Sequence, residues 1–159
     1  MVIRKFKKKD LEAILQMTKE VWDNSSFDQA VEKKFGKREK DWWECKSQSV
    51  KEFIDKHPNW VLVAEENSKI VGYASYSLDN ERKIGDVLNN AVHPNWRGRG
   101  IGKTLHYKVL EELKKEGMEI ALLVTSQDNV PARRMYESAG FEQLWCSLHY
   151  GKKLKCQKS

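Results

Sequence analysis

Cysteine and proline are scarce in this sequence. Its 159 residues include three cysteines, Cys45, Cys146 and Cys156, and none of them belongs to a Cys-x-x-Cys pair or has a histidine at zinc-ligand spacing. An odd, unpatterned set of this kind argues against a disulfide framework and against a zinc site. A reducing cytoplasm is therefore the compartment that the cysteines fit best.

Long apolar runs are also lacking. No stretch of about 18 uninterrupted apolar residues is present, which is the length that a membrane-spanning helix requires. Residues 1–9 are basic, but no apolar segment of the kind found in secretion signals follows them. We therefore expect a cytoplasmic protein that is neither exported nor bound to a membrane.

Internal repeats, low-complexity tracts and Gly/Pro-rich linkers are absent, and Pro58, Pro94 and Pro131 all fall where one element gives way to the next. The content of hydrophobic residues is 40% and that of charged residues is 33%, which is too apolar for a disordered tail and too polar for a membrane protein. A chain of this length fits one core. We predict a single globular domain over residues 1–159.

Clustered charge is missing as well, although the formal net charge is +6. A positive balance is compatible with nucleic acid, an anionic membrane surface or an anionic cofactor. The lysines are spread along the whole chain, so most of them are expected on a solvated surface. Since no recognition-helix, RNP or zinc-finger pattern occurs, the sequence argues against a nucleic-acid partner.

The hydrophobic periodicity predicts alternating strands and helices. A first strand over 2–6 precedes a helix from Leu11, for which Asp10 is the expected N-cap. The segment 25–56 is polar and irregular, with helical turns expected at 39–44 and 50–56. The later elements are strands at 60–65, 70–77, 84–92, 120–125 and 141–150, and helices at 101–116 and 130–138.

The segment Arg97-Gly98-Arg99-Gly100-Ile101-Gly102-Lys103 lies between a predicted strand and a predicted helix. Unpaired N–H groups at a helix N-terminus, glycines that allow close approach and three cations together favour an anion site. A Walker A loop is excluded because Arg97 stands where its first glycine is needed, and the spacing of the three glycines does not fit a dinucleotide fingerprint.

Two motifs carry a resemblance to a known family. Arg-x-x-Gly-x-Gly, after Val92-His93-Pro94 and before an amphipathic helix, resembles the coenzyme A loop of the GNAT N-acetyltransferases. The segment 129–141 is similar to the family's Asn-x-x-Ala-x-x-x-Tyr-x-x-x-Gly-Phe. The resemblance implies an α/β (α+β) fold with a central mixed, mostly antiparallel sheet of six or seven strands and about four flanking helices.

The same resemblance implies an N-acetyltransferase that moves an acetyl group from acetyl-CoA to a primary amine by direct attack in a ternary complex, without a metal. The strand ending at Val92 would splay from its neighbour, and a main-chain N–H near Val92 would polarise the thioester carbonyl. The implied cofactor-binding residues are Val92, Arg97, Gly98, Arg99, Gly100, Gly102, Lys103 and Asn129.

Tyr136 lies at the family's position for the general acid, and a phenol with a pKa of about 10 is suited to protonating a leaving thiolate. The alternative is an aromatic side chain that packs with Met135 or Phe141. Asn129, likewise, is either a cofactor contact or an N-cap, and both roles are compatible.

The sequence does not single out a general base. Family members often use a glutamate on the strand before the glycine loop, whereas this strand offers Asp86, Asn89 and Asn90. Imidazole ordinarily titrates near neutral pH, so His93 and His106 are further, weaker candidates.

The acceptor site is expected in segment 25–56, which in this architecture covers the thioester end of the cleft. An acidic, aromatic site for a cationic amine is one interpretation, and helix packing by the tryptophans is the other. The residues concerned are Asp23, Asp28, Glu32, Trp42, Trp43 and Glu44.

The acceptor stays open among a protein N-terminus, a lysine side chain, an aminoglycoside, a polyamine and a free amino acid. Two rival functions also stay open: a catalytically silent acyl-CoA sensor of the same fold, and a nucleic-acid-binding adaptor. The last expected strand, with Leu144 to Leu148, could pair across a homodimer.

Overall fold

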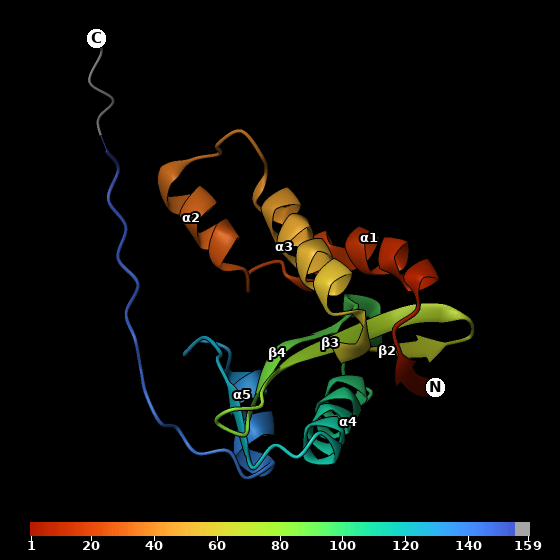
Figure 1. Cartoon of the computed structure of the whole chain (residues 1–159). Helices are drawn as coiled ribbons and strands as arrows, with labels where there is room; N and C mark the ends of the chain where they lie inside the picture. The colour runs from red at the N-terminus through yellow and green to blue at the C-terminus, as the bar shows by residue number, and fades with distance from the viewer. Residues whose placement is uncertain (155–159) are drawn as a thin grey trace.

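A computed structural model describes residues 1–154 and shows one mixed sheet with helices on both faces (Figure 1). The strands are β1 (Val2–Lys5), β2 (Val61–Glu66), β3 (Lys69–Asp79), β4 (Ile84–Val92) and β5 (Ile120–Leu123). The helices are α1 (Leu11–Val21), α2 (Phe27–Phe35), α3 (Trp42–Lys56), α4 (Ile101–Lys115) and α5 (Val130–Ser138).

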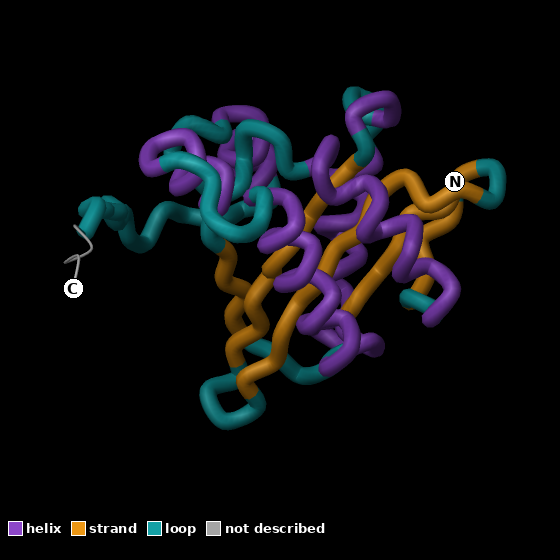
Figure 2. Tube along the Cα trace, turned by 90° about the horizontal axis from the view of Figure 1, so that it is seen from above, coloured by secondary structure: helices purple, strands orange, loops and turns teal. Residues whose placement is uncertain are grey.

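The strands lie in chain order, β1 to β5, and Figure 2 shows them side by side as one layer. The β1–β2, β2–β3 and β3–β4 pairs are antiparallel, and short turns connect β2 to β3 and β3 to β4. In the β2–β3 turn, Asn67 and Ser68 both have positive φ, 48° and 61°, as a two-residue type I′ hairpin requires.

β4 and β5 are parallel, and α4 makes the crossover between them. Their pairing runs only from Ile84↔Ile120 to Val87↔Leu123, so β4 continues to Val92 without β5 beside it. A register shift opposite Ser75 adds one residue to β4 in the same region. β5 ends at Leu123, so beyond Val87 the backbone of β4 has no strand partner on the β5 side. This open stretch of β4 agrees with the splayed strand that the family resemblance implies.

Each face of the sheet has its own apolar core. On one face α1 and α3 pack through Ile14, Val21 and Ile54 against β2 and β3. On the other, α4 packs through Leu105 and Val109. Figure 1 shows α1 and α3 above the sheet and α4 below it. The end of β4 lies between the two layers, because Ala91 belongs to the core under α1 and α3 while Val92 packs against the core under α4.

The expected strand count was wrong, because the described residues form five strands, not six or seven, and five α-helices, not about four. Residues 141–150 are not a strand. After Gly140, whose φ is +88°, residues 141–154 form an extended C-terminal arm that runs past α2 in Figure 1. The arm is rich in β-formers, but it pairs with none of the strands within residues 1–154.

Two local expectations also need correction. Asp10 precedes α1 but its carboxylate does not cap the helix, because it binds Arg4 and accepts a hydrogen bond from the N–H of Lys7. Segment 25–56 is mostly α2 and α3, not isolated turns. Of the three cysteines, Cys45 and Cys146 are free and exposed, and Cys156 lies outside the described residues.

Candidate active site

The glycine loop has the conformation that an anion site needs. Gly98 and Gly100 both have φ of +76°, and a Cβ at either position would meet no atom within 4 Å. Gly100 is the N-cap of α4, and the first intrahelical bond runs from the N–H of Thr104 to the carbonyl of Gly100. The N–H groups of the first turn of α4 thus have no intrahelical acceptor and face the open side of the loop.

The separated end of β4 lies directly under this loop. The side-chain Nδ2 of Asn90 donates to the carbonyl of Gly102 at 2.9 Å, and a Cβ on Gly102 would lie 3.5 Å from Cγ2 of Val92. Oδ1 of Asn90 is buried and has no hydrogen-bond partner among the described residues. A linear ligand with amide groups would find both free strand backbone and a free acceptor here, so the residues fit a pantetheine chain.

The three cations of the loop are used differently. Arg97 donates to the carbonyls of Val92 and Val21, which ties the loop to the end of α1. Arg99 lies over the ring of Trp96, with its Cζ 4.7 Å from the ring centre. Lys103 is exposed on the first turn of α4. Arg99 and Lys103 therefore keep their charges free for a phosphate, while Arg97 has a structural role in addition.

Asn129 acts as the N-cap of α5, where its Oδ1 accepts a hydrogen bond from the N–H of Ala132 at 3.3 Å. The capping alternative is thus present in the structure. Its amide nitrogen has no partner among the described residues, which leaves a cofactor contact compatible with the cap.

Tyr136 projects from α5 onto α4. Its ring lies 5.1 Å from the ring of His106 and 6.1 Å from that of Phe141. Burial raises the pKa of the Tyr136 phenol above its ordinary value, so the hydroxyl stays protonated at neutral pH. The packing role considered from the sequence therefore exists, and it leaves the hydroxyl as a proton donor.

Neither histidine shows the features of a general base. His106 is fully buried, neither of its ring nitrogens has a hydrogen-bond partner within residues 1–154, and burial lowers its pKa. His93 accepts a hydrogen bond from the N–H of Asn95 through Nδ1, and its Nε2 lies 3.4 Å from Glu20. Asp86 is half-buried on β4 within the part that is paired with β5.

Most of the acidic residues expected around the acceptor serve the local fold. Glu32 accepts from the N–H of Trp42, and Glu44 accepts from the N–H of Asp41, so both stabilise the start of α3. Asp23 accepts from Gln29. Trp42 is buried, as in the packing alternative, while Trp43 lies 5.5 Å from Nζ of Lys19.

Sequence reasoning missed Lys46, which the structure places beside Asn89 of β4. Its Nζ lies 4.1 Å from the centre of the Trp22 ring and 3.3 Å from Oδ1 of Asn89. No sequence pattern distinguishes Lys46 from the other lysines, because its surroundings come from α1, α3 and β4 together. Only the packing of these three elements reveals the cluster.

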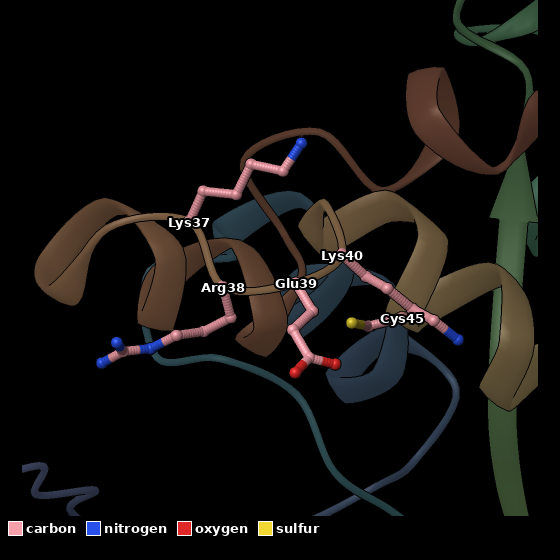
Figure 3. Close-up of a pocket in the computed structure, with 5 residues that line it drawn as sticks. All are labelled: Lys37, Arg38, Glu39, Lys40 and Cys45. Carbon is pink, nitrogen blue, oxygen red and sulfur yellow. The ribbon is translucent and has the colours of Figure 1, made fainter.

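Two of the open hollows on the surface of residues 1–154 are relevant to the site. One of about 660 Å³ is formed by the basic turn between α2 and α3, residues 37–40, with Cys45 (Figure 3). The other, about 290 Å³, lies beside the glycine loop and is lined by Trp96, Arg99 and Ile101 with Met1 and Glu66. None of the residues that line the first hollow belongs to β4 or to the glycine loop.

Residues 1–154 contain no group of three or more His, Cys, Asp or Glu side chains that could hold a metal ion. Within the same residues, no helix combines the length and the apolar character that crossing a membrane requires.

Comparisons with known proteins agree with the geometry. The family model described as "Acetyltransferase (GNAT) family" matches residues 12–141. Acetyltransferase ECA0875 of Pectobacterium atrosepticum is 28% identical over 97% of this chain and 96% of its own length. Mycothiol acetyltransferase of Thermobifida fusca is 33% identical over 47% of this chain, and human N-acetylaspartate synthetase 34% over 57%. The chain spans only 23% and 30% of these two proteins.

Solved structures show the same fold. Ribosomal-protein-alanine N-acetyltransferase from Brucella melitensis has a TM-score of 0.64 at 27% identity, over 91% of this chain and 86% of that one. The PaiA N-acetyltransferase of Thermoplasma acidophilum, solved with coenzyme A, has a TM-score of 0.72 at 20% identity, over 89% of each chain. With its separated β4–β5 pair, its glycine loop and a family match over residues 12–141, the chain belongs to the acetyltransferase (GNAT) family.

Proposed function

We propose that the protein is an N-acetyltransferase that uses acetyl-CoA to acetylate a primary amine by direct attack in a ternary complex. The observation that carries the proposal is the separation of β4 from β5 after Val87, directly under a glycine loop that presents free N–H groups. Together these features offer a site for an extended chain that ends in phosphates.

Acetyl-CoA would supply an acetyl group activated as a thioester. Gly98, Gly100 and Gly102, with Arg99 and Lys103, would hold its pyrophosphate, and Arg97 and Asn129 would support the site from either side. The main-chain N–H near Val92 would donate to the thioester oxygen, where negative charge develops. Asn90 would orient the amide-bearing arm through its free Oδ1.

In the transfer, the neutral amine attacks the thioester carbon and forms a C–N bond, and the C–S bond of the resulting adduct then breaks. The proton that the nitrogen releases passes to water, and water later restores the proton that Tyr136 gives to the sulfur. The Tyr136 hydroxyl would donate a proton to the departing sulfur. Its environment suits this step, because burial keeps the phenol protonated and the rings of His106 and Phe141 hold it in place.

A rival function is a sensor of the same fold that binds acyl-CoA without turnover. Tyr136→Phe separates the two, with Tyr107→Phe on α4 as the matched control. For an enzyme, Tyr136→Phe should lower kcat for thiol release by about 100-fold while coenzyme A binding is retained. Absence of thiol release from the wild-type protein with every amine tested, despite tight acetyl-CoA binding, would establish the sensor instead.

We further propose that residues 1–159 act as one domain in the cytoplasm, where free cysteines such as the exposed Cys45 and Cys146 persist. The chain is also proposed to form a homodimer. In it, the C-terminal arm would pack on the free β5 edge of a second copy, which would cover the exposed Leu144, Trp145 and Leu148.

A further inference from the structure

Lys46 is held by three elements that are far apart in the sequence. Lys46 lies in α3, and its ammonium lies over the ring of Trp22, the residue that directly follows α1. The acceptor of its hydrogen bond, Asn89, belongs to β4. The ring centre is 4.1 Å from Nζ, within the range of a cation–π contact, and Oδ1 of Asn89 is 3.3 Å away.

The two partners of Lys46 are themselves fixed. The Nδ2 of Asn89 donates to Oγ of Ser75 at 2.8 Å, which turns Oδ1 of the same amide toward the lysine. The Nε1 of Trp22 donates to the hydroxyl of the fully buried Tyr73 at 3.0 Å. The ammonium thus occupies a built position and does not sample the surface freely.

This ammonium lacks an anion. No carboxylate oxygen of the described residues lies within salt-bridge distance of Nζ. The carboxylate of Asp28, beyond salt-bridge distance, raises the pKa of Lys46 by less than burial lowers it. Asp28 itself accepts a hydrogen bond from the hydroxyl of Ser26 at 3.5 Å. Burial lowers the pKa of Lys46, which shows that its charge is poorly compensated. A cation in this state is stabilised by any anion that reaches it.

The position faces the reaction site of the proposed function. Asn89 lies between Val87, the last residue of β4 paired with β5, and Val92, at the end of β4. An ammonium has three donors, and Asn89 uses one of them, which leaves two for the oxygens of a ligand. An acceptor amine that approaches the separated part of β4 from the α1–α3 face would pass beside Lys46.

We propose that Lys46 binds a carboxylate of the acceptor, with Trp22 and Asn89 as positioning residues, so that the acceptor is a small amine carrying a carboxylate near its amino group. This inference rests on the proposed function and names its substrate class. It replaces the expectation of an acidic site for a cationic amine, since polyamines and aminoglycosides would meet a like charge here.

The test compares amines that differ only in the carboxylate. Free L-amino acids, their C-terminal amides and dipeptide amides that begin with Asp or Glu are supplied with acetyl-CoA, and thiol release is followed. The wild-type protein should prefer the carboxylate-bearing member of a pair by about 10- to 100-fold in kcat/KM, mainly through KM. A preference for free amino acids or for the acidic dipeptide amides supports the proposal and identifies the source of the carboxylate.

Lys46→Met should remove this preference and Lys46→Arg should retain part of it, whereas Lys51→Met, on the exposed side of the same helix, should leave it unchanged. Equal use of acids and amides by the wild-type protein would overturn the proposal. So would an equal loss for both in Lys46→Met, because Lys46 would then act on every acceptor.

Calorimetry separates this inference from the proposed function. With coenzyme A present, titration of the best amino acid and its amide measures acceptor binding without turnover. Binding that favours the acid and is lost in Lys46→Met supports the carboxylate site even if no thiol is ever released, a result that would overturn the enzyme alone. Saturable coenzyme A binding with no acid-selective binding by any probe would overturn the carboxylate site alone.

Discussion

Arg4 on β1 joins two carboxylates from different parts of the chain. Its guanidinium pairs with both oxygens of Asp10, at 2.7 and 2.9 Å, and also contacts Glu65 on β2. Asp10 is only 3% exposed. Despite the cost of burial, the hydrogen bonds from Arg4 and from the N–H of Lys7 hold the pKa of Asp10 below its ordinary value.

Arg4→Met should therefore destabilise the protein by about 3 kcal/mol, because it leaves a buried carboxylate unpaired. Denaturant unfolding at pH 7 measures the change. Lys51→Met, which breaks the exposed pair with Asp55, is the control and should cost at most about 0.5 kcal/mol. Since the folded pKa of Asp10 is depressed, its contribution is full above pH 4 and disappears as the pH falls through the folded pKa. Similar losses for the two variants at pH 7 would contradict this account.

His106 gives the stability a second dependence on pH, which comes from burial and not from hydrogen bonds. Its pKa is lowered by burial, so the unfolded chain binds a proton more readily than the folded protein does. Stability should fall as the pH drops below about 6.5, the ordinary pKa of histidine, toward the folded pKa. In His106→Leu the fall in Tm between pH 7.5 and 5.5 should be smaller than in wild type. His149→Leu, in the exposed arm, should leave it unchanged, and parallel Tm profiles for all three proteins would argue against a neutral buried His106.

At the scale of elements, the close approach of β3 and β4 depends on Gly72. A Cβ at this position would lie 2.7 Å from the main-chain oxygen of Ala91, which cannot move without shifting β4. Gly72→Ala should cost about 1–3 kcal/mol of stability. Gly102→Ala in α4, where the nearest atom would be 3.5 Å away, should instead stabilise by about 0.5–1 kcal/mol. Chemical denaturation of both variants measures the sign of the stability change. A Gly72→Ala variant as stable as wild type would mean that β3 and β4 can move apart without loss of stability.

Many of the strands and helices were predictable from local sequence patterns. The β-formers in residues 84–92 predicted β4 with the bounds that the structure has. The glycines at 98, 100 and 102 predicted the loop, and the helical periodicity after them predicted α4. The two helices in segment 25–56 were expected only as turns at 39–44 and 50–56, because their apolar faces are short. The Asp41-x-x-Glu44 capping box was the local signal for the start of α3, and the added contact from Glu32 of α2 depends on packing. The role of Lys46 depends on three packed elements, so no local pattern could reveal it.

At the scale of the whole molecule, the C-terminal arm leaves apolar side chains uncovered. Trp145 is 84% exposed and Leu148 is 74% exposed. The ring of His149 lies 5.2 Å from that of Phe27, the first residue of α2. The sequence pattern of this segment is that of a strand, but whether a strand forms depends on a neighbour, which a pattern cannot supply. A second copy offers such a neighbour at its β5 edge.

Sedimentation velocity at rising concentration should therefore show a dimer for the wild-type protein. The double variant Trp145→Ser, Leu148→Ser should shift it to monomer, since it removes the apolar surface that the contact would bury. Val2→Ser, which alters another exposed apolar residue at the opposite edge of the sheet, should not. A monomeric wild-type protein at every concentration would exclude the proposed dimer.

The most direct test of the central claim is a calorimetric titration with acetyl-CoA of three proteins: wild type, Gly100→Trp and Gly117→Trp. Gly100 and Gly117 lie at opposite ends of α4, both have φ of +76°, and a Cβ at either would meet nothing within 4 Å, so the two variants carry the same strain. Saturable binding to wild type and Gly117→Trp that is lost in Gly100→Trp is the result that we predict. Absence of binding to the folded wild-type protein, or equal binding to all three, would contradict an acetyl-CoA site at the glycine loop.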